Sequence, residues 1–253
     1  MTGWWGGNMS YTWSRAYDNI IGMGNYYSSS PENQNSYTYI PWSPYYNPDL
    51  DYGRSVNDTP HKIVMAPTIM LPFGQGQRFV KEGKMADLLL GGWSLTPVVT
   101  FSSGFPMGVT QSEGTSFLLG GQKRPDIVPG QPFLVPGDLG DRITSTINAP
   151  VWDNMWYNPA AFSMSAYNRF GNAPRMLPGV YSVWRKNVDL AVSKSFKTGG
   201  STRASLSMDV MNLFNIVQWR PPTSSSFGST SFGQVIAQSN FMRMIQFNLR
   251  FSF

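Results

Sequence analysis

The 253-residue chain contains no cysteine and only one histidine, His61. The lack of cysteine excludes disulfides, thiolate metal ligands and cysteine nucleophiles. A zinc site or a serine–histidine–aspartate triad would have to be built around His61 alone. We therefore expect no catalytic residues, no metal site, no cofactor and no enzymatic activity, and we interpret His61 as a structural residue at the start of a strand.

Charge and long apolar runs are also scarce. Charged residues make up 13% of the chain, about half the share typical of soluble proteins. Basic residues never occur in runs longer than two, which argues against a nucleic-acid partner. No apolar run approaches the roughly 18 residues that a transmembrane helix needs. A membrane β-barrel tolerates this composition because lipid, not water, covers its outside.

The clearest pattern is the alternation over the last ten residues, Met244 to Phe253. Side chains in a strand point alternately to opposite faces. One face is therefore wholly apolar, and the other is mainly polar. Ten residues at about 3.3 Å each, tilted by about 45°, span about 23 Å, close to the apolar band of an outer-membrane barrel. The apolar set is Ile245, Phe247, Leu249, Phe251 and Phe253.

Six segments show related alternation: 4–14, 61–71, 93–102, 187–196, 203–211 and 244–253. The connections between them are alternately long and short, as in outer-membrane barrels with external loops and periplasmic turns. Pro67 predicts a bulge or an unpaired position, and residues 79 to 90 predict a short helix. Lys194 falls on an apolar face near a strand end, where its side chain is expected to snorkel to the interface. The predicted fold class is all-β, an antiparallel transmembrane β-barrel segment of about six strands with long extracellular loops.

Six strands cannot close a membrane barrel, because known outer-membrane barrels begin at about 8 strands. An open edge in hydrocarbon leaves backbone groups unsatisfied, at several kcal/mol each. Met1 to Trp5 contain no basic segment or apolar core, so they do not form a signal peptide. We expect residues 1–253 to be the C-terminal part of a larger barrel, with no plug domain in this chain.

Several short motifs, in order, resemble the barrel of Oar-like TonB-dependent transporters of the outer membrane. They begin with Asn57-Asp58-Thr59-Pro60-His61 and Leu71-Pro72-Phe73-Gly74-Gln75-Gly76. The match continues through Gly92-Trp93-Ser94-Leu95, Ser103-Gly104-Phe105-Pro106, Trp156-Tyr157-Asn158-Pro159-Ala160-Ala161-Phe162, Phe170-Gly171-Asn172-Ala173, Asn187-Val188-Asp189-Leu190, Asn212-Leu213-Phe214-Asn215 and Phe232-Gly233-Gln234-Val235. The resemblance covers about residues 50 to 253, and it rests on the order and spacing of the motifs.

The resemblance implies a plugged barrel of roughly 22 strands in the cell outer membrane. Its partners would be outer-membrane lipid, the outer-membrane assembly machinery, the rest of the barrel with its plug, and TonB through that plug. The chain's function would then be uptake or translocation of a substrate across the outer membrane. The terminal aromatic set of Phe247, Phe251 and Phe253 resembles the signal that the assembly machinery reads.

Two other functions fit the same sequence. The long loops are rich in aromatic residues, whose flat rings with a polar edge could stack on a ligand or hold the loops together. An outer-membrane adhesion or surface-display protein could use such loops to bind an extracellular polymer. A secreted carbohydrate-binding β-sandwich would also show alternating strands. The loop ligand candidates are Trp42, Tyr45, Tyr46, Trp152, Trp156 and Tyr157.

Overall fold

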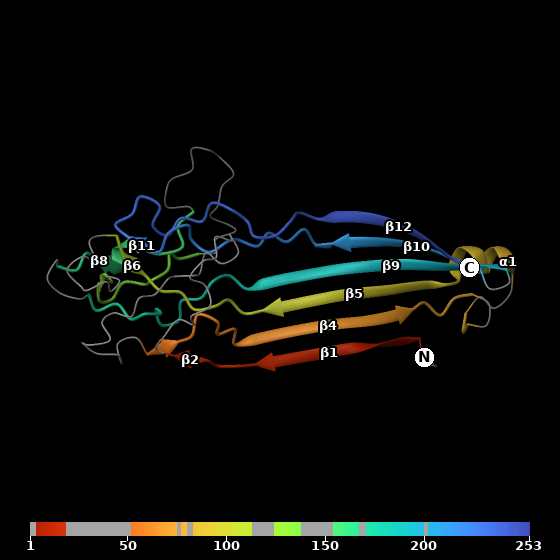
Figure 1. Ribbon diagram of the computed structural model, residues 1–253, viewed down its shortest axis with the longest axis horizontal. Helices are drawn as coiled ribbons and strands as arrows, with labels where there is room; N and C mark the ends of the chain where they lie inside the picture. The colour runs from red at the N-terminus through yellow and green to blue at the C-terminus, as the bar shows by residue number, and fades with distance from the viewer. Residues whose placement is uncertain are drawn as a thin grey trace.

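The computed structural model describes residues 4–18, 52–74, 77–79, 83–112, 124–137, 154–166, 171–199 and 202–253. Its main element is a six-stranded sheet in which neighbouring strands run antiparallel in chain order (Figure 1). Within the described residues, β1 and β12 each have a partner on one side only, so the sheet is not closed. The strands are β1 (Trp5–Trp13), β4 (His61–Met70), β5 (Trp93–Ser102), β9 (Arg185–Gly199), β10 (Thr202–Met211) and β12 (Met244–Ser252).

All six predicted strands are present, and the expectation of an open antiparallel segment is confirmed. The largest difference in bounds is at β9, which has 15 residues and extends past the predicted segment at both ends. The short helix expected within residues 79 to 90 is α1 (Lys84–Leu90). None of the helices in the described part of the chain is long and apolar enough to span a membrane.

Long and short connections lie at opposite ends of the sheet (Figure 1). Helix α1 and both chain termini lie at one end, which we call the short-turn end. The three long connections gather at the other end. This arrangement matches the predicted alternation of connection lengths.

The sheet has one apolar face and one polar face, because residues directly opposite each other in the ladder share a face. One row across all six strands illustrates the apolar face. It consists of Trp5, Ile69, Leu95, Val192, Met208 and Phe247, each paired with the next. The neighbouring row of Ser94, Ser193, Ser207 and Asn248 lies on the polar face. The two faces predicted strand by strand therefore join into two continuous surfaces.

Pro67 leaves an unpaired position in the sheet without inserting an extra residue. Pairing between β4 and β5 runs to Met65 opposite Val99 and resumes in the same register at Ile69 opposite Leu95. On the other side of β4, Gly7 lies opposite Pro67. A Cβ at Gly7 would come within 2.4 Å of the Pro67 Cα, so only glycine fits beside the proline ring.

Aromatic rings mark both ends of the apolar face. At the loop end, the His61 ring stacks on Tyr11 and on Trp184, with centroids 6.2 and 6.3 Å apart. The Tyr11 hydroxyl also forms a hydrogen bond with His61 Nδ1, at 2.9 Å. At the short-turn end, the apolar face carries Trp93 and Phe196. Aromatic girdles of this kind flank the apolar band of membrane barrels, which gives His61 the structural place expected for it.

The long connections form a packed body. We call their described residues (14–18, 52–60, 103–112, 124–137, 154–166, 171–184 and 212–243) the loop body. It contains the short elements β2 (Tyr17–Asp18), β3 (Gly53–Arg54), β6 (Thr110–Gln111), β7 (Asp126–Ile127), η4 (Pro159–Ala161), β8 (Phe162–Ser163) and β11 (Ser226–Phe227). Its hydrophobic core comprises Met107, Val109, Met155, Tyr157, Ala161, Phe162, Leu177, Val180 and Phe232. This core lies in the loops because the apolar face of the sheet is turned outward.

Candidate functional site

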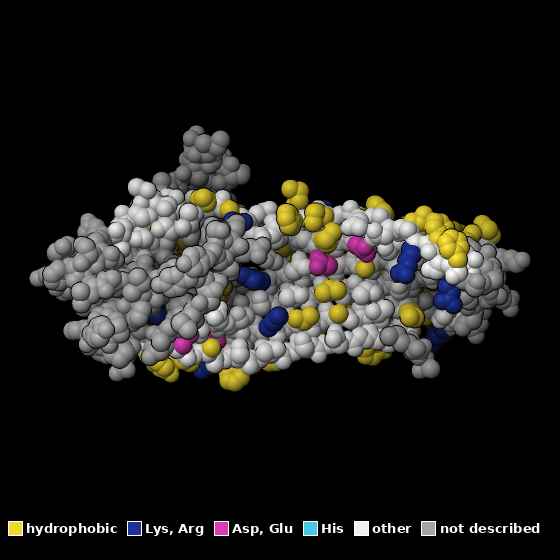
Figure 2. Space-filling model, viewed as in Figure 1, with side chains coloured by type: hydrophobic (Ala, Val, Ile, Leu, Met, Phe, Trp, Pro, Cys, Tyr) yellow, Lys and Arg dark blue, Asp and Glu magenta, His cyan; other side chains and the backbone are white. Residues whose placement is uncertain are grey.

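The polar face of the sheet is one of two surfaces with functional chemistry. Asp189 and Asp209 lie on this face near its middle, on the adjacent strands β9 and β10. Figure 2 shows acidic side chains near the middle of the sheet, with hydrophobic and basic side chains on either side of them. Arg203 and Arg250 lie on the same face, opposite Ser252 and Ser205.

Both aspartates are held by hydrogen bonds from neighbouring amides. Asp189 Oδ2 accepts from the side-chain amide of Asn187 at 2.7 Å, and its Oδ1 accepts from the backbone N–H of Asn212 at 2.8 Å. Asp209 Oδ2 accepts from the Asn248 side-chain amide at 2.7 Å. A hydrogen-bonded polar surface of this kind suits a water-filled lumen or the surface of a docked domain.

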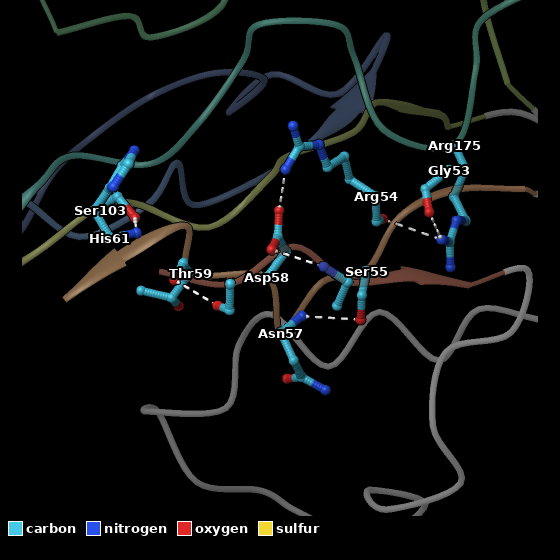
Figure 3. A network of polar contacts seen from close by, with 11 residues as sticks. Gly53, Arg54, Ser55, Asn57, Asp58, Thr59, His61, Ser103 and Arg175 are labelled. Carbon is cyan, nitrogen blue, oxygen red and sulfur yellow. Dashed lines mark hydrogen bonds and ion pairs between the residues drawn. The ribbon is translucent and has the colours of Figure 1, made fainter. Parts of the chain in front are cut away.

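The second surface is the loop body, and its base is fixed by Asp58 (Figure 3). Asp58 is 1% exposed. Its Oδ1 accepts from the backbone N–H of Ala16 at 3.0 Å, and its Oδ2 accepts from Arg54 Nη1 at 2.6 Å. The hydrogen bond to Asp58 raises the pKa of Arg54. Asp58 thereby joins the segment that leaves β1 to the segment that enters β4.

The adjacent residues complete this base. The Ser14 hydroxyl donates to the Thr59 carbonyl at 3.1 Å. The backbone N–H of His61 donates to Ser103 Oγ at 3.0 Å, and the Ser103 N–H donates to the His61 carbonyl at 2.8 Å. The Asn57-Asp58-Thr59-Pro60-His61 motif therefore fixes the point where the first two long connections leave the sheet.

Arg175 connects the second long connection to the first. Its Nη2 forms an ion pair with Asp18 and donates to the carbonyls of Gly53 and Arg54 at 3.2 and 3.1 Å. The Arg175 side chain is only 1% exposed. Its Nε and Nη1 are buried and have no hydrogen-bond partner among the described residues.

A second buried arginine, Arg124, lies in the same connection and is 1% exposed. Its Nη1 donates to the Ala173 carbonyl at 3.4 Å. Burial, and secondarily the positive charge of Arg175, lower the pKa of Arg124.

The hydrophobic core joins the second long connection to the third. The Tyr157 ring stacks on Phe232 at 5.4 Å between centroids, and the Tyr157 hydroxyl donates to the Gly108 carbonyl at 3.1 Å. The backbone N–H of Trp156 donates to the Gly233 carbonyl at 2.7 Å. A hollow of about 280 Å³ opens beside the core, lined in part by Met155, Phe227 and Phe232. Its volume is close to the lower end of the range for small-ligand pockets, about 300–1,000 Å³.

The predicted loop ligand residues have different positions. Tyr157 is 0% exposed, which corrects the idea that its ring could contact a ligand; it packs the core instead. Trp156 is partly buried against the same core. Trp42, Tyr45, Tyr46 and Trp152 lie outside the described residues, so their role stays a prediction.

The predicted assembly residues lie on β12 or just after it. Phe247 and Phe251 are on the apolar face, opposite Met208 and Ala204 of β10. Phe253 follows the strand and is 97% exposed. Their outward position is compatible with recognition by assembly machinery, which stays a prediction.

Sequence reasoning missed Arg175, Asp18 and the phenylalanines beside the hollow. The sequence did contain a signal for Phe232, because this residue belongs to a motif that carries the family resemblance. Asp58, at the base of the loop body, belongs to another such motif. No local pattern shows that Arg175 reaches Asp18, because the two residues are 157 positions apart.

An amphipathic antiparallel sheet with aromatic rings at both ends and its long loops on one side defines an outer-membrane β-barrel protein. A family model described as "Outer membrane beta barrel domain" matches residues 1–246. The chain belongs to this family and is located in the outer membrane, where its apolar face contacts lipid. Neither a curated protein nor a solved structure matches the chain.

A sandwich would require a second large sheet packed on the first. The described residues contain a single six-stranded sheet and three two-stranded pairings. Together with the family match, this corrects the idea of a secreted β-sandwich.

Proposed function

We propose that this chain is the C-terminal part of the barrel of an Oar-like TonB-dependent transporter, which moves a substrate across the outer membrane. The observation that carries the proposal is the open, two-faced sheet with free edges at β1 and β12. The ordered motifs from Asn57 to Phe253 support the choice of family.

The free edges argue that more strands complete this barrel. An edge strand of 9 residues, such as β12, leaves about half of its backbone N–H and C=O groups without a ladder partner. Each such group costs several kcal/mol in hydrocarbon. A cost of this size is avoided only if further strands pair with β1 and β12 inside the bilayer.

The polar face supports a lumen that is filled by a plug. A barrel of roughly 22 strands encloses a plugged lumen. In that barrel, Asp189 and Asp209 would face the plug or the water around it. The plug would contact TonB, and the barrel section would form wall and loops without performing a chemical step. The aromatic end of β12 would serve the assembly machinery.

Adhesion or surface display through the loops is the alternative, and the hollow beside Met155 and Phe227 is compatible with it. The described aromatic residues favour it less, because Tyr157 is wholly buried and Trp156 is partly buried in the core.

The test is to extract the complete gene product from outer membranes with detergent and to determine its mass and peptide map. We expect one polypeptide long enough for roughly 22 strands and a plug, which cross-links to TonB in cells. A product with a small barrel, no plug and no TonB cross-link would overturn the transport proposal and favour adhesion.

A further inference from the structure

Helix α1 carries an apolar stripe that no part of the described chain covers. Met85, Leu88 and Leu89 are 68%, 51% and 62% exposed. Positions i, i+3 and i+4 of a helix lie on one face, so these three side chains form one surface. Asp87, between them in sequence, is only partly exposed.

The C-terminal end of α1 is fixed to the apolar face of the sheet. Trp93 Nε1 donates to the Leu89 carbonyl at 2.9 Å. Lys194 Nζ donates to the same carbonyl at 3.2 Å and to the Gly91 carbonyl at 2.7 Å. The cation also suits the negative end of the helix dipole.

Trp93 and Lys194 lie opposite each other on β5 and β9, on the apolar face. The Lys194 ammonium is 4.8 Å from the centroid of the Trp93 ring and 5.2 Å from that of Phe196. Lys194 is only 6% exposed, and its ammonium, expected to reach the interface, is bound there by the carbonyls of Leu89 and Gly91.

The location of α1 identifies what covers the stripe. The helix lies at the short-turn end, which faces the periplasm in outer-membrane barrels. Its C-terminal end is attached to Trp93 and Lys194 of the apolar face, which lipid covers. A hollow of about 570 Å³ beside the helix is lined by Trp93 and Phe196 of the apolar face and by Ser94 and Ser195 of the polar face, so it lies at the rim of the sheet where the two faces meet.

We propose that α1 is an interfacial helix whose stripe of Met85, Leu88 and Leu89 inserts into the periplasmic leaflet of the outer membrane. Its partner is phospholipid: the apolar stripe contacts the acyl chains, while Lys194 and Trp93 hold the helix against the barrel wall. The inference rests on the lipid-facing assignment of the apolar face.

The experiment uses single-cysteine variants. Because the sequence has 0 cysteines, the introduced thiol is the one site in this sequence that the fluorophore labels. The complete protein is purified, labelled with an environment-sensitive fluorophore at Leu89→Cys, and reconstituted in phospholipid vesicles with bromine on the upper acyl carbons. Interfacial helices insert about 5–10 Å into the headgroup and acyl boundary, so most of the label's emission should be quenched.

Two control positions make the outcome decisive. A label at Leu206→Cys, on the apolar face of β10, should be quenched, whereas one at Ile236→Cys, exposed in the loop body, should not. If position 206 is quenched and position 89 behaves like position 236, the helix is not in lipid and the inference is overturned. If position 206 is not quenched either, the lipid-facing assignment itself fails.

A second variant tests the positioning role of Lys194. Lys194→Leu, combined with the label at position 89, should reduce the quenching, because it removes the donor to the helix carbonyls. Lys186→Leu is the matched control, because Lys186 lies on the same face at the other end of β9 and is exposed. Equal quenching in both variants would remove Lys194 from the proposal.

Discussion

Placing an arginine on the apolar face near the middle of the sheet tests the two-faced assignment most directly. Met208 lies on β10, between Val192 of β9 and Phe247 of β12 in the ladder. Both neighbours are apolar, and neither can accept a hydrogen bond from a guanidinium. Met208→Arg should therefore carry the full cost of an arginine near the bilayer midplane, about 2–4 kcal/mol.

The adjacent residue provides the matched control. Ser207 lies on the polar face, opposite Ser193 and Asn248. An arginine there would lie in the lumen near the carboxylate of Asp209. We expect Ser207→Arg to change the free energy of unfolding by no more than about 0.5 kcal/mol, as is usual for solvated positions.

The assay is reversible unfolding of the complete protein from lipid bilayers in denaturant, followed by tryptophan fluorescence. A cost of 2–4 kcal/mol corresponds to about a 30- to 700-fold fall in the folding equilibrium constant. Equal costs for Met208→Arg and Ser207→Arg, or a larger cost at Ser207, would refute the assignment of the faces.

Three further predictions concern the loop body. Asp58→Ala leaves the Ala16 N–H and the Arg54 guanidinium without their acceptor, at about 1–3 kcal/mol; protease cleavage near residue 54 in intact outer membranes should rise, whereas Asp126→Ala should leave it unchanged. Arg175→Lys cannot keep the contacts that Arg175 makes with the first long connection, so hydrogen exchange of residues 16–18 and 53–54 should accelerate; unchanged exchange would mean that the ion pair does not hold the connections together. Gly104→Ala would place a Cβ 1.8 Å from the Ser182 carbonyl oxygen, so we expect the loop body to unfold. Limited proteolysis should then cleave the loop body while the barrel stays resistant. A fully protected loop body would contradict this close packing.

The sheet could be predicted from the sequence because its residues face two solvents. Lipid on one side and water on the other impose a period of two on each strand, and the pattern survives even where Pro67 interrupts it. The register between strands could not be predicted from any one strand alone. It follows from pairing, as in the row that joins Leu95 to Val192 and Met208.

The loop body could not be predicted, because its contacts have no period. Its elements are short, and glycines such as Gly104 let its backbone segments approach closely. Tyr157 shows the limit clearly: an aromatic residue in a polar loop fits a ligand contact or a core position equally well by sequence. Only the packing against Phe232 separates the two. Lys194 is similar, since its acceptors are carbonyls of a helix 103 or more residues away in the chain.

The joining of the loops through Arg175 and through the core around Phe232 has a consequence for recognition from outside the cell. An antibody or phage that binds this end of the protein meets a mosaic of residues contributed by separate stretches of chain. Synthetic peptides copied from one loop would lack the neighbours that give that mosaic its shape. Immunisation with the intact, membrane-embedded protein should therefore yield binders that such peptides do not compete away.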